Sequence, residues 1–345
     1  RAYGLIFGLV LSVSLVLGLF WGRSGQQEIQ EDPLLSRAER LEVCHALAGT
    51  LQSQQQADGG FSGIPQNPPA LWDTAQQLVS LQHSRRCGVD INDAELRAND
   101  FLIRWLNDTK EEELLGFGLA WMLMSLHQDA SGMEGKLRGI LNRYRLPDGS
   151  YAVTLTDVRA KNSDLYMTTL AAWALIVRSN SIDDALKETL GFLITQLRTQ
   201  AVQEISGLEE QIWWTVHLAV QKDPSIPLTA ADNRRLATNM MRRCQIDEEA
   251  STCLVPIWPS GTFNYTRSNG DAANVLAQGH PWSVIASGVL ANASGLDPEQ
   301  RDALGLIHRW GQSRLTQSPD TLILSPGYVL SESLIAVTMG LPSRP

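Results

Sequence analysis

Three copies of one short pattern constrain the fold of this chain more than any other feature. Each copy is a turn with glycine and an aromatic residue after it, and an apolar helical segment follows. The turns are Asp58-Gly59-Gly60-Phe61, Asp148-Gly149-Ser150-Tyr151 and Ser260-Gly261-Thr262-Phe263. A supersecondary unit that recurs along a chain usually stacks on its neighbours or closes into a ring. The repeat therefore predicts an array of helical hairpins.

Apolar residues at three-and-four spacing predict twelve helices, which pair into six hairpins. They run over residues 37–55, 71–85, 94–106, 112–127, 132–144, 164–178, 183–199, 207–221, 229–244, 281–292, 298–313 and 327–340. Every second helix carries little charge, whereas the others are charged along one face, which is typical of buried and surface helices respectively. We expect an all-α fold, an (α/α)6 toroid with six inner and six outer helices. Short strands are expected only near residues 151–155 and 262–265.

The beginning of the chain departs from this pattern, because residues 3–22 carry no charge and are mostly apolar. Such a stretch matches the hydrocarbon core of a bilayer, which is about 30 Å thick. A cleaved signal peptide is the alternative, although its apolar region is normally shorter and ends at a small-x-small site. We expect a transmembrane anchor over residues 1–22, a polar linker over 23–36, and a toroid domain over 37–345 outside the cytoplasm.

The expected anchor contains two pairs of glycines four residues apart. This spacing lets a second helix approach closely in lipid, although glycine is common in membrane helices generally. The pairs favour packing against a membrane-protein partner through Gly4, Gly8, Gly18 and Gly22.

The four cysteines favour an oxidising compartment such as the periplasm, a lumen or the cell exterior. Cys44 lies near the start of the first soluble helix and Cys87 just after the second, so both lie at one end of an antiparallel hairpin. Cys244 and Cys253 would close a short loop. No two cysteines have the C-x-x-C spacing of a zinc site, and we expect neither a metal nor a cofactor.

The net charge of −9 argues against nucleic acid as a partner, because binding a phosphate backbone requires a basic surface. The apolar fraction of 43% is that of a folded chain with a substantial core.

The first two turn motifs resemble a known superfamily. The segments 54–61 and 72–75, and again 148–151 and 166–169, are similar to the repeat of terpenoid cyclases and protein prenyltransferase β-subunits. The resemblance implies an α/α toroid. It does not extend to the catalytic motifs, since the Asp-x-Asp-Asp acid of the squalene-type cyclases and a cysteine-containing zinc site within the inner helices are both missing. The motif therefore transfers the fold better than the chemistry.

The loops that lead into the inner helices of a toroid gather at one mouth of the ring. Four residues near these entrances are candidates for catalysis, since paired carboxylates serve six-hairpin glycosidases as acid and base: Asp73, Asp164, Glu209 and His280. Aromatic and acidic neighbours are candidates for ligand binding: Trp72, Tyr166, Glu210, Trp282, Tyr328 and Glu332. The competing interpretation is structural, because helix starts favour carboxylates as caps and tryptophans favour the core.

Because known catalytic signatures are missing, our main expectation is a non-catalytic binding or assembly subunit of a membrane or envelope complex. The alternative is an envelope enzyme acting on glycan, a hydrolase or a lyase, with the carboxylates at the mouth of the ring. A second alternative is an isoprenoid- or lipid-binding toroid.

Overall fold

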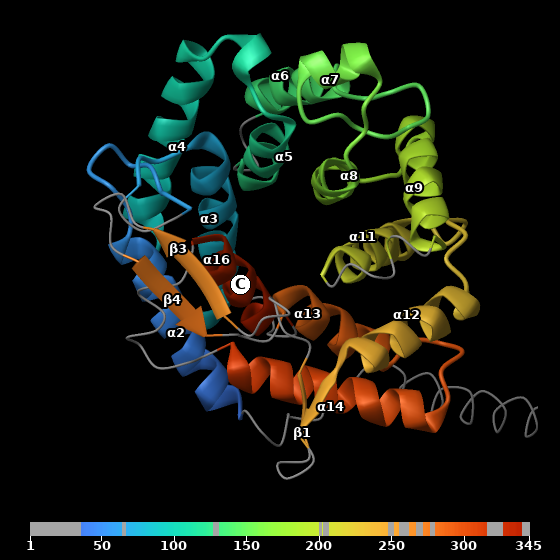
Figure 1. Ribbon diagram of the computed structural model, residues 1–345. Helices are drawn as coiled ribbons and strands as arrows, with labels where there is room; N and C mark the ends of the chain where they lie inside the picture. The colour runs from blue at the N-terminus through green and yellow to red at the C-terminus, as the bar shows by residue number, and fades with distance from the viewer. Residues whose placement is uncertain are drawn as a thin grey trace, which may run out of the picture.

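The computed structural model describes residues 36–63, 67–126, 131–199, 202, 207–247, 252–254, 262–266, 272–276, 280–315 and 327–339. Within these residues, twelve helices of ten residues or more form two concentric rings (Figure 1). The inner helices are α3 (Leu71–Ser84), α5 (Gly116–Ser125), α8 (Leu165–Arg178), α11 (Leu208–Lys222), α13 (Pro281–Leu290) and α16 (Gly327–Thr338). The outer helices are α2 (Arg37–Ser53), α4 (Asn92–Asp108), α6 (Ser131–Asn142), α9 (Asp184–Leu197), α12 (Ala230–Arg243) and α14 (Pro298–Arg314).

Contacts between successive inner helices close the ring. Each inner helix packs on the next one along the chain, and α16 packs back on α3. The inner helices are buried over most of their length, as their low charge predicts. The predicted helical toroid is confirmed.

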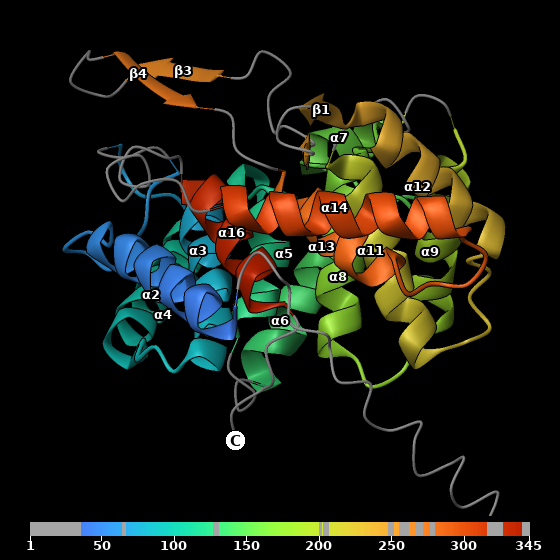
Figure 2. The same cartoon turned by 90° about the horizontal axis from the view of Figure 1, so that it is seen from below.

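The connections contain shorter elements: η1 (Arg85–Cys87), η2 (Glu111–Glu113), α7 (Leu155–Ala160), β1 (Gln245–Asp247), β2 (Thr252–Leu254), β3 (Thr262–Thr266) and β4 (Ala272–Leu276). The four strands make two antiparallel hairpins, β1–β2 and β3–β4, and Figure 2 shows β3–β4 beyond one face of the ring. The strand expected at 262–265 is confirmed, with Thr262 opposite Leu276.

Two expected boundaries are wrong. The helix predicted from residue 112 begins at Gly116, because Glu111–Glu113 forms a separate 3-10 turn. The strand expected over 151–155 is only an isolated bridge between Arg145 and Tyr151, since Thr154 caps α7 with its side chain and starts a helix instead.

The first two turn motifs adopt the same structure. Gly59 and Gly149 have φ of 91° and 86°, a region that only glycine occupies without strain. In the first copy, Asp58 accepts the backbone N–H of Gly60 at 3.0 Å, and in the second Asp148 accepts that of Ser150 at the same distance. The aromatic residue of each turn then donates its N–H at 2.9 Å to a threonine of the following inner helix, Thr74 or Thr168. These hydrogen bonds fix where α3 and α8 begin.

The third copy differs. Ser260 and Gly261 lie outside the described residues, while Thr262 and Phe263 belong to strand β3 rather than to a turn.

The predicted disulfide between Cys44 and Cys87 is confirmed, with an S–S distance of 2.06 Å. Cys244 at the end of α12 is disulfide-bonded, and its expected partner Cys253 lies in β2, whose side chains are outside the described ones. The expected anchor with Gly4, Gly8, Gly18 and Gly22 also lies outside the described residues. Among the helices that the structure describes, none has the length and apolar character to cross a bilayer.

Candidate functional site

A cavity of about 290 Å³ lies at the end of the ring where the inner helices begin. The starts of five inner helices line it, and α5 is the inner helix that contributes no lining residue. Its walls are Trp72, Gln76, Tyr166, Gly207, Leu208, Gln211, His280, Trp282, Tyr328, Val329 and Glu332.

Six of the ten residues singled out in the sequence line this cavity: Trp72, Tyr166, His280, Trp282, Tyr328 and Glu332. The other four, Asp73, Asp164, Glu209 and Glu210, are not among its lining residues. The sequence argument missed the two amides Gln76 and Gln211. The one sequence feature that could have singled them out is that each is a polar residue in a helix expected to be buried.

Aromatic rings form two layers within the ring of helices. Near the mouth, Phe117 lies between Trp72 and Tyr166, with centroid distances of 5.6 and 5.4 Å. One helical turn deeper on α5, Trp121 meets Trp173 edge-to-face at 5.4 Å, and Trp173 meets Trp282 at 5.3 Å. Trp72 and Tyr166 of the upper layer and Trp282 of the deeper layer line the cavity, whereas Trp121 and Trp173 pack the bore. Flat aromatic surfaces of this kind bind ligands that have one apolar face.

Glu332 on α16 is the carboxyl group among the described lining residues. Burial raises the pKa of Glu332 to about 7, and the neighbouring Trp282 indole partly opposes the shift. Burial and the nearby charge of Glu332 together raise the pKa of Tyr328 to about 12. A carboxyl group with a pKa near neutrality can donate a proton at the pH of most cells.

Asp164 lies beside the same tyrosine as Glu332. It is the N-cap of α8 and accepts the backbone N–H of Met167 at 2.7 Å. Burial raises the pKa of Tyr166, and the charges of Glu332 and Asp164 raise it further. The charges of both carboxylates therefore reach the Tyr166 hydroxyl.

Asp73 contacts Gly63 in the loop that precedes α3. Burial raises the pKa of Asp73, and the backbone N–H of Gly63 donates to its carboxylate. Asp73 therefore anchors the entrance to α3.

Glu209 and Glu210 form a buried polar cluster at the start of α11. Arg243 donates to Glu209 at 2.7 Å and to Glu210 at 2.8 Å, and both carboxylates are fully buried. Asn239 donates to Glu209 at 2.8 Å, and Ser283 donates to Glu210 at 2.9 Å. Burial raises the pKa of Glu209 to about 7, against the effects of Arg243 and Asn239. The cluster joins α11 to α12 and α13 and supports the cavity wall from behind.

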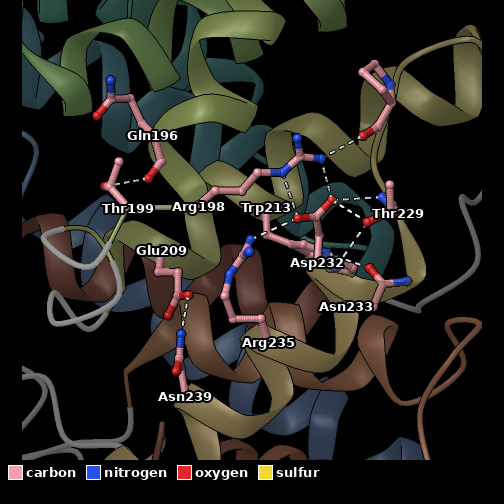
Figure 3. A network of polar contacts seen from close by, with 11 residues as sticks. Gln196, Arg198, Thr199, Glu209, Trp213, Thr229, Asp232, Asn233, Arg235 and Asn239 are labelled. Carbon is pink, nitrogen blue, oxygen red and sulfur yellow. Dashed lines mark hydrogen bonds and ion pairs between the residues drawn. The ribbon is translucent and has the colours of Figure 1, made fainter.

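A second polar network fixes the helix that carries Arg243. Arg198 at the end of α9 pairs with Asp232 at 2.9 Å, and Arg235 pairs with the same carboxylate (Figure 3). Thr229 caps α12 in a capping box with Asp232, and the Trp213 indole donates to Asn233 at 3.0 Å. These contacts lock α12 against α9 and α11, so that Asn239 lies against Glu209.

His280 lies against Gly207, the N-cap of the helix α11 that carries Glu209 and Glu210. It caps α13, and its Nδ1 accepts the Trp282 backbone N–H at 3.3 Å. A Cβ at Gly207, where φ is 83°, would lie 2.0 Å from the His280 Nε2. Burial lowers the pKa of His280 to about 4, so the imidazole is neutral near pH 7. A neutral imidazole at the cavity can exchange hydrogen bonds with an uncharged ligand.

Comparisons with known proteins identify the fold. No protein-family model and no curated protein matches the chain. Among solved structures, the GH76A alpha-1,6-mannanase from Salegentibacter sp. HEL1_6 is similar, with a TM-score of 0.60 and 11% identity over 87% of this chain and 98% of that one.

An inactive variant of that mannanase in complex with alpha-1,6-mannotetrose gives a TM-score of 0.60 at 12% identity, with the same coverage. A protein from Actinoplanes gives a TM-score of 0.50 at 12% identity, over 86% of this chain and 98% of that one. At such identities the likeness concerns the fold.

These findings correct the main functional expectation. The similar mannanase structures favour the glycan-active alternative over the non-catalytic binding or assembly subunit. The turn motifs that resemble terpenoid cyclases and prenyltransferases indicated a toroid correctly, while membership of that superfamily is not shown. Within the described residues, no group of His, Cys, Asp and Glu could hold a metal ion.

Proposed function

We propose that the protein is a glycan-active hydrolase that binds an oligosaccharide in the cavity at the mouth of the toroid. The observation that carries the proposal is Glu332, a carboxyl group whose pKa burial raises to about 7 in a cavity with aromatic walls. Aromatic rings and an adjacent acid suit a sugar ring, which has an apolar face and an oxygen to be protonated. The fold shared with alpha-1,6-mannanases supports the same class of activity.

In this proposal Glu332 in the cavity wall is the general acid, and Asp164, two residues before the lining residue Tyr166, is the general base. Hydrolysis of a glycosidic bond needs one carboxyl group to protonate the leaving oxygen and a second to assist the attack of water. The protonated Glu332 donates its proton as the C–O bond breaks, and Asp164 accepts the proton of the attacking water. Tyr166, which lines the cavity and whose pKa is raised by the charges of both carboxylates, contacts the bound sugar.

The disulfide indicates the cellular compartment of the protein. A disulfide between Cys44 and Cys87 is stable in an oxidising environment, so we place the toroid outside the cytoplasm. Glycans of the cell envelope or the surroundings are then accessible to it.

The test is incubation of the chain with a panel of oligosaccharides, among them alpha-1,6-mannotriose and alpha-1,6-mannotetrose, with products separated by chromatography and identified by mass spectrometry. For a hydrolysed substrate, Glu332→Gln keeps the shape of the site and removes its proton. We expect kcat/KM to fall by about 10²- to 10⁴-fold.

The matched control is Glu113→Gln, which changes an exposed glutamate of η2 remote from the cavity. It should leave kcat/KM unchanged. If no glycan in the panel is bound or cleaved by the unaltered chain, the proposed function is wrong.

A further inference from the structure

Buried polar groups without hydrogen-bond partners occur on several inner helices, and four of them lie on two helices that face each other across the ring. On α3 they are the indole Nε1 of Trp72 and the Oε1 of Gln76, and on α11 they are the Nε2 of Gln211 and the Oγ1 of Thr215. Each pair is spaced by four residues and therefore lies on one face of its helix. The helices α3 and α11 occupy opposite positions in the inner ring (Figure 1).

These groups are costly unless something binds them. Gln76 is 1% exposed and Gln211 is 2% exposed, and a buried polar atom without a partner destabilises the folded chain. Native structures satisfy nearly all such atoms, so a cluster of exceptions needs a physical reason. Both amides line the cavity beside Glu332, and a bound ligand there is within their reach.

The chemistry of the cluster specifies the ligand. An amide offers a donor and an acceptor, and an indole offers a donor, whereas none of these groups carries a charge. A sugar hydroxyl both donates and accepts, and vicinal hydroxyls can bridge two such groups. The lining residues also include no cation, since they contain neither lysine nor arginine and burial lowers the pKa of His280 to about 4. An uncharged sugar therefore fits better than a uronate or a sugar phosphate.

The size of the cavity adds a second restriction. Its volume of about 290 Å³ is at the lower end of the range of small-molecule sites, roughly 300–1,000 Å³. A space of this size between the starts of the inner helices takes the end of a glycan and not a long internal stretch.

We propose that Gln76 and Gln211 form a recognition subsite for the terminal, uncharged sugar ring of a glycan, which enters the ring of helices between α3 and α11. The inference rests on the proposed function and names its substrate class. Trp72 and Trp282 flank the sugar ring, and the two amides form hydrogen bonds with its hydroxyls from opposite sides. Hydrolysis in this site releases sugars from a chain end.

The test uses the full chain with Gln76→Leu and Gln211→Leu, and it measures binding and stability in the same samples. Leucine removes the amide at similar volume. We expect the Kd for alpha-1,6-mannotriose, or for the best neutral oligosaccharide of the panel, to rise about three- to tenfold per variant. The thermal midpoint should stay equal or rise, because each variant also removes an unsatisfied buried group. A purely structural glutamine would instead lower the midpoint and leave the Kd unchanged.

The control variant is Gln54→Leu, which removes an amide that also has a buried, unpartnered Nε2 but does not line the cavity. Its Kd should equal that of the unaltered chain. Deoxy analogues of the terminal sugar complete a double-mutant cycle. Removing a hydroxyl that binds Gln76 should raise the Kd of the unaltered chain and leave the Kd of Gln76→Leu unchanged.

The outcomes separate the two proposals. If the unaltered chain neither binds nor cleaves any glycan, the proposed function fails. If it acts on glycan but both leucine variants keep its affinity within twofold, or if it binds only oligouronides, the subsite is wrong and the proposed function stands. A product pattern of internal fragments without released terminal sugars also overturns the subsite.

Discussion

Two acidic regions of the ring share a shifted pKa and differ in almost everything else. Burial raises the pKa of Glu332 and of Glu209 to about 7. Glu209 is held by Arg243 and Asn239 and is closed to solvent, whereas Glu332 lines a cavity. A perturbed pKa marks functional candidates and structural ion pairs alike. Access to a cavity, and not the pKa, separates a proposed acid from a structural one.

The largest expected effect tests the structural region. Arg243→Met leaves Glu209 and Glu210 buried together without their cation, and breaking such a pair costs about 3–5 kcal/mol. We expect a loss of this size in the free energy of unfolding, measured by urea denaturation at pH 8. The loss should shrink at pH 5, where Glu209 is protonated.

The control is an exposed ion pair on an outer helix. Arg97 lies 3.1 Å from Asp93 with side chains 42% and 84% exposed, and Arg97→Met should cost less than about 1 kcal/mol. Equal losses in the two variants would mean that the buried cluster does not hold α11 to α12.

A smaller effect is expected where the two regions meet. In Gly207→Ala, the new Cβ would collide with the His280 ring and the backbone would keep a φ of 83°, which costs about 1–3 kcal/mol in a residue other than glycine. We expect lower stability by denaturation and weaker glycan binding by calorimetry, because the imidazole must leave its place in the cavity wall.

Gly49→Ala is the matched control, since a Cβ at this exposed position of α2 meets nothing within 4 Å. It should raise stability by about 0.5–1 kcal/mol, the ordinary gain of alanine in a helix. A Gly207→Ala variant with the same gain would show that the close contact with His280 is not formed.

The sequence predicted the ring well because the information is local. Helical periodicity and the contrast between charge-poor and amphipathic segments specify which helices are buried. The first two turns were predicted for a local reason as well. Asp58 and Asp148 accept hydrogen bonds within their own turns, and Thr74 and Thr168 accept the N–H of the aromatic residue that follows. The third turn has serine in place of aspartate, and its Thr262 and Phe263 lie in a strand.

The site was less predictable because it depends on distant partners. Glu209 looked like a catalytic residue at a helix start, but the cation that pairs with it comes from Arg243 at the far end of the next helix. Six of the residues at the expected mouth do line one cavity, because the starts of the inner helices converge in any toroid. Gln76 and Gln211 could not be singled out, since only the fold shows that their amides lack partners.

The smallest expected effect separates Glu209 from Glu332 by pH. A carboxyl group with a raised folded-state pKa contributes stability that is complete below its ordinary pKa of 4.5 and is lost as the pH rises through about 7. The free energy of unfolding of the unaltered chain, relative to Glu209→Gln, should therefore fall by about 2 kcal/mol from pH 5 to pH 8. The difference is needed because burial lowers the pKa of His83 and His280 to about 4, which gives the opposite slope in the same range.

For Glu332 the same protonation should appear in the rate. Only the protonated acid can serve the leaving oxygen, so kcat/KM of the hydrolysed glycan should decline above about pH 7. Glu332→Gln should abolish this decline together with most of the rate, and Glu209→Gln should preserve it. If Glu209→Gln removes the decline while Glu332→Gln keeps it, the two carboxylates have exchanged roles. The acid would then lie in the cluster with Arg243, and cavity access would not be what distinguishes a proposed acid from a structural one.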